Sequence, residues 1–285
     1  MGDPEPSGAE ERRARIAQLV EERGFVAVAD LSGLLGVSSV TVRTDLDALG
    51  ARGVVTRIRG GAMPARALAA PERPFEEAER EAAAAKAAIA ADAVRLIAPG
   101  MSILLDVGTT AAAVARELLR RDDLHDVTVI TNGLAIALSL EPAVPRLQVV
   151  VTGGTLRPLQ HSLVAPLGGL LLDHIHADLA FIGCNGVDVD AGITNVNLPE
   201  ADIKRAMIGA AAEVVVLADG AKIGRARLGK IASIADVDVI ITDPSAPSET
   251  LERLESLGGP RIVVATPNAC SQDASPRSRR SLHAG

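Results

Sequence analysis

The sequence predicts an α/β protein in two parts: a small helical domain closed by a β-hairpin, and a larger domain built around a mostly parallel sheet. Three observations favour this fold class. Short helical patterns precede a basic hairpin pattern before residue 64. Beyond residue 100, continuous apolar runs alternate with helical patterns, as in strands that are covered on both faces. Polar residues gather where those runs end.

The composition disfavours several classes of protein. The chain has 285 residues and is 48% hydrophobic, but its apolar runs are too short to span a membrane. Its N-terminal stretch, MGDPEPSGAEERR, is polar and acidic and lacks the apolar region of a secretory signal. We therefore expect a cytoplasmic protein.

The residues that usually bind metals or form disulfides are sparse. Cys184 and Cys270 lie far apart, and His174 and His176 have no companion ligands at a metal-binding spacing. We expect no metal site and no cofactor. The chain has no Trp and no Tyr, which disfavours ligands that stack on aromatic rings. A ligand would be held by hydrogen bonds and charge.

Charge is unevenly distributed along the chain. The net charge of −7 argues against a protein that coats nucleic acid uniformly. However, Arg52, Arg57, Arg59 and Arg66 fall in a stretch without acidic residues. This stretch predicts a local basic patch.

Residues 11–63 predict the helical domain, after a tail over residues 1–10 that we expect to be disordered. A first helix is expected from Glu11 to near Gly24, with Ile16, Leu19 and Val20 at helical spacing, and a second helix fits residues 28–35.

A third helix follows a turn and begins with Ser38 as its cap. Val42, Leu46 and Leu49 recur at helical spacing and predict its buried stripe. The opposite face presents Ser39, Val40, Arg43 and Thr44 to solvent.

These helices form a helix-turn-helix pattern, whose third helix fits the major groove of DNA. After Gly53, the stretch VVTRIRGGAM predicts a basic strand pair, or wing, that carries Arg57 and Arg59. The alternative is a small helical bundle used for protein contacts, with both arginines as solvated surface charges.

The second domain is expected to cover residues 76–268. Residues 64–75 are rich in Pro and Ala and predict a linker, whereas residues 76–98 predict one continuous helix. Residues 269–285 predict a disordered tail. The strands are predicted by the apolar runs ILL, VTVI, LQVVV, LAFIG, VVVLAD, VDVIITD and RIVVA.

The stretch ILLDVGTTAAAVARELLR, residues 103–120, predicts a strand, a loop and the start of a helix. Asp106 ends the apolar run, Gly108 permits a tight turn, and Thr109 and Thr110 open the helix. Free backbone N–H groups at a helix start attract anions, so this loop predicts a phosphate or carboxylate site. The alternative is a plain βα turn in which one threonine caps the helix.

Other polar residues follow the predicted strands. Ligands bind at the carboxyl ends of the strands in open α/β sheets, so we expect these residues to converge on one site. The alternative is that they only form turns. The residues are Asp106, Thr131, Asn132, Thr152, Gly153, Gly154, Asn185, Gly186 and Asp219.

Two further segments supply charge. Glu200 and Lys204 lie one helical turn apart, where the alternative is a surface ion pair. Lys222 follows Asp219 in another strand-end loop, and lysine is a suitable partner for phosphate.

The stretch SSVTVRTDLDALGARGVVTRIRGGAM resembles the N-terminal domain of the DeoR family of bacterial transcriptional regulators. The family's recognition helix has a Ser-x-x-Thr-aliphatic-Arg-Arg-Asp-Leu pattern, and this chain departs from it at Thr44, where a second basic residue is usual. The resemblance implies DNA contacts from the recognition helix and the wing. The residues are Ser38, Ser39, Thr41, Arg43, Thr44, Arg57 and Arg59.

The blocks LLDVGTT, VITNGLAIA, VVVTGGTLR, FIGCNGVDVDAGITNVNLPEADIKRAM and VVVLADGAKIG resemble the DeoR C-terminal sensor domain. That resemblance implies a Rossmann-like fold similar to ribose-5-phosphate isomerase and a phosphorylated sugar or related metabolite as effector. The implied pocket contains Asp106, Gly108, Thr109, Thr110, Thr131, Asn132, Gly153, Gly154, Gly183, Asn185, Gly186, Glu200, Lys204, Asp219 and Lys222.

The resemblance therefore implies a DNA-binding regulator, a repressor of a sugar or carbon-metabolism operon, rather than an enzyme. We expect it to bind operator DNA as a homo-oligomer, because two half-sites multiply affinity. One alternative is an isomerase-like enzyme with Glu200 as base and Lys204 on the phosphate, which would have no use for a helix-turn-helix. Another is an architectural DNA-binding protein whose second domain has no ligand.

Overall fold

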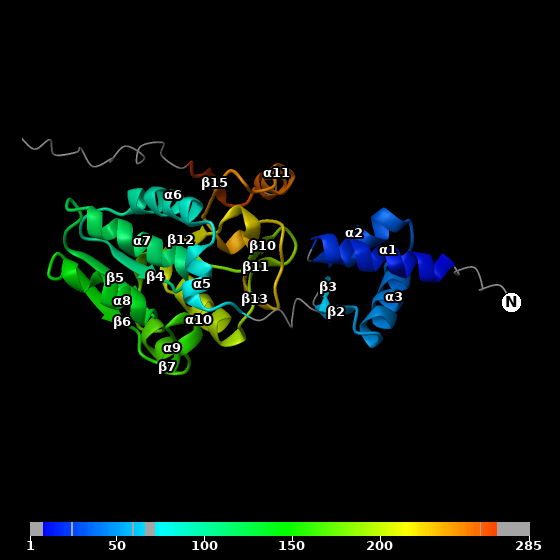
Figure 1. The fold of residues 1–285 in the computed structure, drawn as a ribbon, viewed down its shortest axis with the longest axis horizontal. Helices are drawn as coiled ribbons and strands as arrows, with labels where there is room; N and C mark the ends of the chain where they lie inside the picture. Colours follow the sequence, from blue (N-terminus) through cyan, green and yellow to red (C-terminus); the bar gives the residue numbers. More distant parts are fainter. Residues whose placement is uncertain (1–7, 24, 59, 66–71, 257, 267–285) are drawn as a thin grey trace, which may run out of the picture.

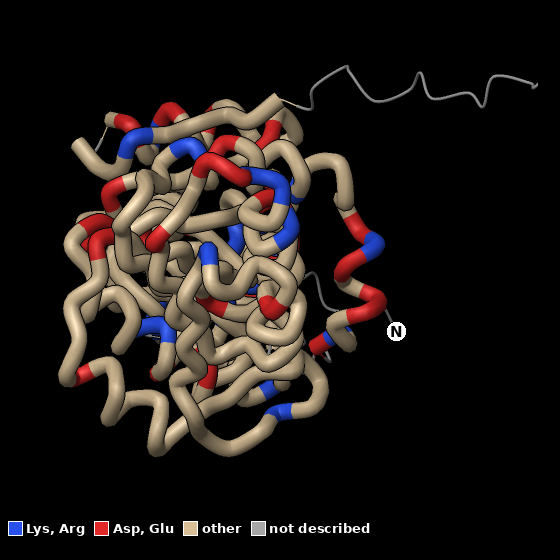
Figure 2. The backbone as a smooth tube through the Cα atoms, turned by 90° about the vertical axis from the view of Figure 1, so that its left-hand side faces the viewer, with Lys and Arg blue, Asp and Glu red and all other residues tan. Residues whose placement is uncertain are grey.

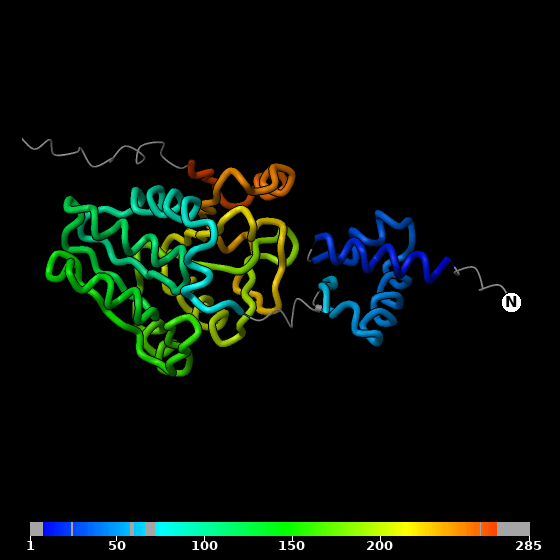
Figure 3. Tube along the Cα trace, in the orientation of Figure 1, coloured from blue at the N-terminus to red at the C-terminus, as the bar shows by residue number. Residues whose placement is uncertain are grey.

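A computed structural model of the chain describes residues 8–23, 25–58, 60–65, 72–256 and 258–266. Figures 1 and 3 show a small N-terminal domain and a larger C-terminal domain. Arg59, residues 66–71 of the expected linker and the expected C-terminal tail lie outside the described residues.

The N-terminal domain packs three helices against a short antiparallel sheet with the strand order β1-β3-β2. The helices are α1 (Gly8–Arg23), α2 (Val28–Leu35) and α3 (Ser39–Ala51). The strands are β1 (Val26–Ala27), β2 (Val55–Ile58) and β3 (Gly61–Pro64).

The predicted core of this domain is confirmed. Val42, Leu46 and Leu49 of α3 are buried, and they pack with the predicted apolar positions of α1. Ser38 caps α3 as predicted, because its hydroxyl oxygen accepts a hydrogen bond from the Thr41 backbone N–H at 3.1 Å. A helix-turn-helix and a two-stranded wing thus occur in the predicted order.

The first helix begins earlier than the sequence suggests. Helix α1 starts at Gly8, so the end of the tail expected over residues 1–10 is helical. Glu10 and Glu11 lie in its first turn, where carboxylates stabilise the helix dipole. Glu10 also pairs with Arg52 beyond α3, with 2.8 Å between Oε1 and Nη2.

The C-terminal domain is built on a seven-stranded sheet in which every neighbouring pair is parallel. Its strand order is β15-β14-β12-β9-β4-β5-β6. Each predicted apolar run forms one strand. The strands are β4 (Ser102–Leu105), β5 (Val127–Thr131), β6 (Leu147–Val151), β9 (Ala177–Gly183), β12 (Ala211–Leu217), β14 (Val239–Thr242) and β15 (Arg261–Val264).

Helices cover both faces of the sheet, which explains why the strands are apolar without alternation. One apolar core contains Ile89 of α6 and Val114 of α7, and a second contains Met207 of α10. The helices are α5 (Phe75–Arg80), α6 (Ala83–Ala93), α7 (Thr109–Arg120), α8 (Leu134–Leu140), α9 (Leu167–Leu172), α10 (Leu198–Gly209) and α11 (Ser248–Ser256).

The domain is completed by short elements that the sequence did not predict. A two-stranded hairpin joins β7 (Thr155–Arg157) to β8 (Ser162–Val164), and β10 (Gly186–Asp188), β11 (Gly192–Asn195) and β13 (Gly229–Ala232) form a separate antiparallel sheet. The 3-10 turns are η1 (Val94–Leu96), η2 (Glu141–Ala143), η3 (Pro158–Gln160), η4 (Gly220–Lys222) and η5 (Ile234–Asp236).

The continuous helix predicted over residues 76–98 is wrong. The chain forms α5 and α6 with a break between them, where Ala82 adopts a left-handed backbone with φ of 49°. The buried ammonium of Lys86 holds the break by donating hydrogen bonds to the Ala78 carbonyl at 2.5 Å and the Glu81 carbonyl at 2.6 Å. A charge buried in the domain therefore compensates for the lost helical hydrogen bonds.

None of the described helices is both long enough and apolar enough to cross a membrane. Acidic and basic positions are interspersed along the tube in the view of Figure 2.

Candidate functional site

The N-terminal domain presents polar side chains on the exposed side of α3. Arg43 is exposed and makes no ion pair with any residue that the structure describes, whereas the Thr44 hydroxyl donates to the Val40 carbonyl at 3.1 Å. The hydroxyls of Ser38 and Thr41 lie 2.9 Å apart at the start of the helix, next to the partly buried Ser39. Arg43 is thus the free cation of this face among the described residues.

Asp45 occupies the opposite, buried side of α3 and ties this helix to α1. Its carboxylate accepts hydrogen bonds from Nε of Arg12 at 2.5 Å and from Nε of Arg13 at 2.9 Å. Burial favours a higher pKa for Asp45, but the hydrogen bonds from the two arginines outweigh it, so that the pKa lies below its usual value. Asp45 therefore holds the orientation of α3 and does not face a partner.

The wing is linked to α3 by an exposed ion pair. Nη1 of Arg57 on β2 lies 2.5 Å from Oδ1 of Asp47 on α3. A phosphate that binds Arg57 would have to compete with this carboxylate. Arg59, the other predicted wing residue, lies outside the described residues.

The C-terminal domain contains a cavity of about 490 Å³ at the carboxyl ends of its central strands. The loops after β4, β9 and β12 form one part of its wall, and α10 adds Glu200 and Lys204. Many of the predicted pocket residues line this cavity: Gly108, Thr109, Thr110, Gly183, Asn185, Glu200, Lys204, Asp219 and Lys222.

Other predicted pocket residues lie outside this lining and shape the loops. The Thr131 hydroxyl accepts a hydrogen bond from the Gly133 N–H at 3.0 Å, and Nδ2 of Asn132 donates to the Leu163 carbonyl at 3.1 Å. At Gly154, φ is 132° and a Cβ atom would lie 2.3 Å from the Val164 carbonyl oxygen. Gly153 and Gly186 also lie outside the lining, and Asp106 lies behind it.

The start of α7 faces the cavity without a side-chain cap. Gly108 is the N-cap residue, with φ of 109°, and no side chain bonds to the helix start there. Thr109 and Thr110 are the first residues of the helix itself, so the alternative in which a threonine is the cap does not hold. Free N–H groups and two hydroxyls are therefore available to an anion.

A buried ion pair supports the floor of the cavity. The ammonium of Lys204 contacts Oδ2 of Asp106, which also accepts a hydrogen bond from the Gly183 N–H at 2.9 Å. Burial favours a lower pKa for Lys204, but the carboxylates of Asp106 and Glu200 outweigh it and raise that pKa. The two carboxylates thus favour the charged form of Lys204. Oδ1 of Asp106 has no partner among the described residues.

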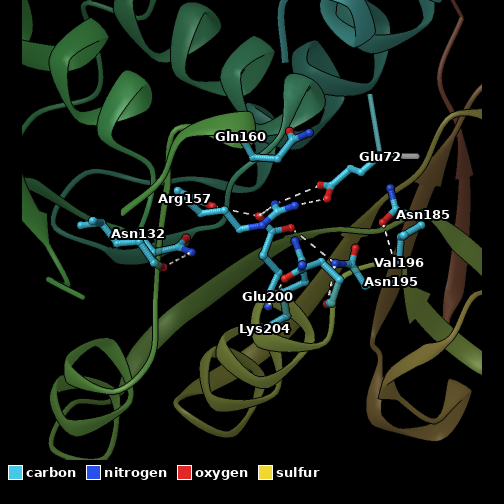
Figure 4. Close-up of polar contacts among 12 residues, drawn as sticks. Glu72, Asn132, Arg157, Gln160, Asn185, Asn195, Val196, Glu200 and Lys204 are labelled. Atoms are coloured by element: carbon cyan, nitrogen blue, oxygen red, sulfur yellow. Dashed lines mark hydrogen bonds and ion pairs between the residues drawn. The ribbon is translucent and has the colours of Figure 1, made fainter. Parts of the chain in front are cut away.

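Glu200 is held by three donors (Figure 4). Its Oε1 lies 2.6 Å from Nη1 of Arg157 and accepts a hydrogen bond from the Ser162 hydroxyl at 2.8 Å. Its Oε2 accepts a longer hydrogen bond, 3.4 Å, from Nδ2 of Asn195. The alternative of a surface ion pair between Glu200 and Lys204 is wrong, because both side chains are buried and Lys204 pairs with Asp106.

Sequence reasoning missed several residues in or beside the cavity wall. Lys86 lines it from α6, and Arg157 binds both Glu200 and Glu72, although Glu72 belongs to the expected linker. Three of the chain's four lysines therefore line the cavity. Because lysine is scarce in this sequence, each lysine was a candidate for the cavity wall, and this could have indicated Lys86.

The described lining is rich in charge and slightly basic. It contains six basic and four acidic side chains. The basic residues are Arg73, Lys86, Lys204, Lys222, Arg225 and Arg227, and the acidic residues are Glu72, Glu81, Glu200 and Asp219. Such a wall suits a compact ligand that carries both an anionic group and hydroxyls.

Comparison with protein families matches both domains. Residues 12–66 match the DeoR-like helix-turn-helix domain, and residues 81–244 match the DeoR C terminal sensor domain.

Curated relatives match over nearly their whole length. The HTH-type transcriptional regulator GlpR of Haloferax volcanii is 37% identical over 248 residues, which cover 87% of this chain and 95% of that protein. The HTH-type transcriptional repressor CsqR of Escherichia coli is 31% identical over 244 residues, 86% of this chain and 91% of that protein.

Solved structures show weaker similarity. Ribose 5-phosphate isomerase A of Methanocaldococcus jannaschii aligns with 48% of this chain and 53% of its own, at 25% identity and a TM-score of 0.36. The full-length sorbitol operon regulator SorC of Klebsiella pneumoniae aligns with 74% of this chain and 89% of its own, at 14% identity and a TM-score of 0.32.

Proposed function

This chain is a member of the DeoR family of transcriptional regulators, and from that premise we propose that it represses a sugar or carbon-metabolism operon. In this proposal α3 and the wing bind operator DNA in the cytoplasm. A phosphorylated sugar or related metabolite binds the cavity of the C-terminal domain and changes the affinity for DNA.

The observation that carries the choice of effector is the combination of charges in the cavity. The free N–H groups at the start of α7 share one cavity with the ammonium groups of Lys86, Lys204 and Lys222. Helix starts and ammonium groups both stabilise a phosphate. Asp219 has a buried carboxylate oxygen without a partner among the described residues, which supports a ligand that also carries hydroxyls.

The isomerase-like alternative has less support. A general base must accept a proton, but both oxygens of Glu200 already accept hydrogen bonds, one of them from a guanidinium. The relatives are also named as regulators and not as enzymes. The C-terminal domain therefore serves to sense a ligand.

A thermal-shift screen against phosphorylated sugars and their unphosphorylated parents tests the proposal. A ligand at a hundred times its dissociation constant stabilises the native protein by about 2.7 kcal/mol, a rise in melting temperature of roughly 5–10 °C. Circular dichroism or an external dye is the readout, because the chain has no Trp or Tyr. The phosphorylated sugar should stabilise the protein far more than its parent. Equal stabilisation by both would refute the anion site, and turnover of the phosphate would restore the enzyme alternative.

A further inference from the structure

The segment that enters the C-terminal domain lies against the cavity. Residues 72–82, here called the strap, contribute Glu72, Arg73 and Ala78 to the cavity wall, together with both residues of the break before α6. The strap also lies in sequence between the helix-turn-helix and the sheet.

The strap is attached to the turn between β7 and β8. Nε2 of Gln160 donates to the Arg73 carbonyl at 2.8 Å, and Nε2 of His161 lies 2.8 Å from Oε1 of Glu76. The strongest attachment is Glu72, whose two carboxylate oxygens meet the two terminal nitrogens of Arg157 (Figure 4).

Glu72 binds Arg157 in the way that a phosphate would. Nη1 of Arg157 donates to Oε1 of Glu72 at 3.1 Å, and Nη2 contacts Oε2, so the carboxylate fits the fork of the guanidinium. Phosphates bind arginine through the same two-point geometry. Arg157 itself is outside the cavity lining, whereas Glu72 and Glu200 are part of it.

The two carboxylates beside Arg157 differ in how they are held. Glu200 belongs to α10 and is fixed by Ser162 and Asn195 as well as by Arg157. Among the described contacts, Glu72 is held by Arg157 alone. Glu72 is therefore the carboxylate that can leave.

An anion cannot bind Arg157 while both carboxylates remain, because it would meet two like charges at short range. We propose that Glu72 occupies an anion site at Arg157 and that the anionic group of the effector replaces it, which loosens the N-terminal end of the strap. This inference rests on the proposed function, and it adds both a binding residue and the route by which the ligand reaches the DNA-binding domain.

Replacement has a consequence for affinity. A site that is mostly filled by the chain's own carboxylate binds its ligand more weakly, in proportion to the fraction of molecules in which it is free. Weakening the Glu72 contact should raise the free fraction and tighten anion binding.

The test compares Glu72→Gln with Glu79→Gln in the full chain. Glu79 is a matched control, because it lies on the same strap and pairs with Arg116 at 2.6 Å but is not part of the cavity lining. Inorganic phosphate is titrated calorimetrically against chloride at equal ionic strength, and hydrogen exchange of residues 72–82 is measured with and without phosphate.

Glu72→Gln should bind phosphate roughly tenfold more tightly than the wild type, whereas Glu79→Gln should match the wild type. Phosphate should accelerate exchange in the wild-type strap, and Glu72→Gln should show fast exchange before phosphate is added. Equal phosphate affinities, or a strap that stays protected when phosphate is bound, would overturn the inference and leave the proposed function standing. If phosphate binds none of the three proteins, the anion site of the proposed function fails as well.

Discussion

Asp45 shows how a single buried carboxylate can orient a surface from behind, here the face of α3 that we propose binds DNA. It is 1% exposed, yet it is charged, because Arg12 and Arg13 of α1 surround it. Buried charges are tolerated only when they are paired in this way. The side chains that project from α3 therefore keep their direction relative to the rest of the domain.

Asp45→Asn should lower the stability of the N-terminal domain by roughly 1–3 kcal/mol at neutral pH, because two charge-assisted hydrogen bonds are lost. The folded pKa of Asp45 is depressed, so its contribution is present above about pH 4, the unfolded value, and is lost as the pH falls through the folded pKa. Hydrogen exchange of α3 amides measures the difference between variant and wild type, which should shrink in acid. Asp47→Asn is the control on the same helix, because its ion pair is exposed and should change stability little.

At the cavity, Thr109→Val removes a hydroxyl and Lys222→Met removes a charge, and both residues line the wall. Each variant should bind operator normally and respond weakly to the effector. Lys230→Met is the control, because Lys230 is the one lysine outside the lining. The measurement is operator binding with and without the stabilising sugar phosphate. Normal effector responses in both cavity variants would remove these residues from the site.

At the scale of elements, the wing should bind phosphates through Arg57. Arg57→Ala should weaken binding to all DNA sequences and reduce the log–log salt slope by roughly one unit, the value for one phosphate contact. Asp47→Ala should strengthen binding to all DNA sequences, because it frees Arg57 from its ion pair. Fluorescence anisotropy with labelled DNA over a salt series measures both effects. A salt slope that neither substitution changes would exclude Arg57 from the interface.

The elements that the sequence predicts best are those with a clear apolar run or a clear helical spacing of apolar residues. The seven strands follow from apolar runs, and α3 follows from its stripe and its serine cap. The break between α5 and α6 could not be predicted, because a stretch rich in alanine fits one helix as well as two. Only the folded chain places the ammonium of Lys86 where it can hold both carbonyls.

The same limit applies to the site at the scale of the whole molecule. The residues at the start of α7 are adjacent in sequence, so their pattern is visible there. Arg157 meets Glu72 across 85 positions and Glu200 across 43, and no local pattern records those contacts. The sequence therefore indicates the loop at the start of α7 but not the contacts of Arg157.

The whole protein should act on DNA as an assembly of at least two chains. A single α3 reads only a short half-site, and two half-sites about 10 base pairs apart, or a multiple of that distance, would multiply the affinity. Native mass spectrometry of the operator complex should show two or more chains per duplex. One chain per operator at saturation would contradict this expectation.

The position of Glu72 has a consequence for anyone who recombines these domains. The region that matches the sensor family begins at residue 81, whereas the described part of the cavity wall begins at Glu72. A chimaera joined at the family boundary would thus inherit the cavity without its own Glu72 and Arg73. A graft that starts upstream of Glu72 carries the whole described wall of the cavity, so the segment to exchange between regulators is longer than the one defined by homology.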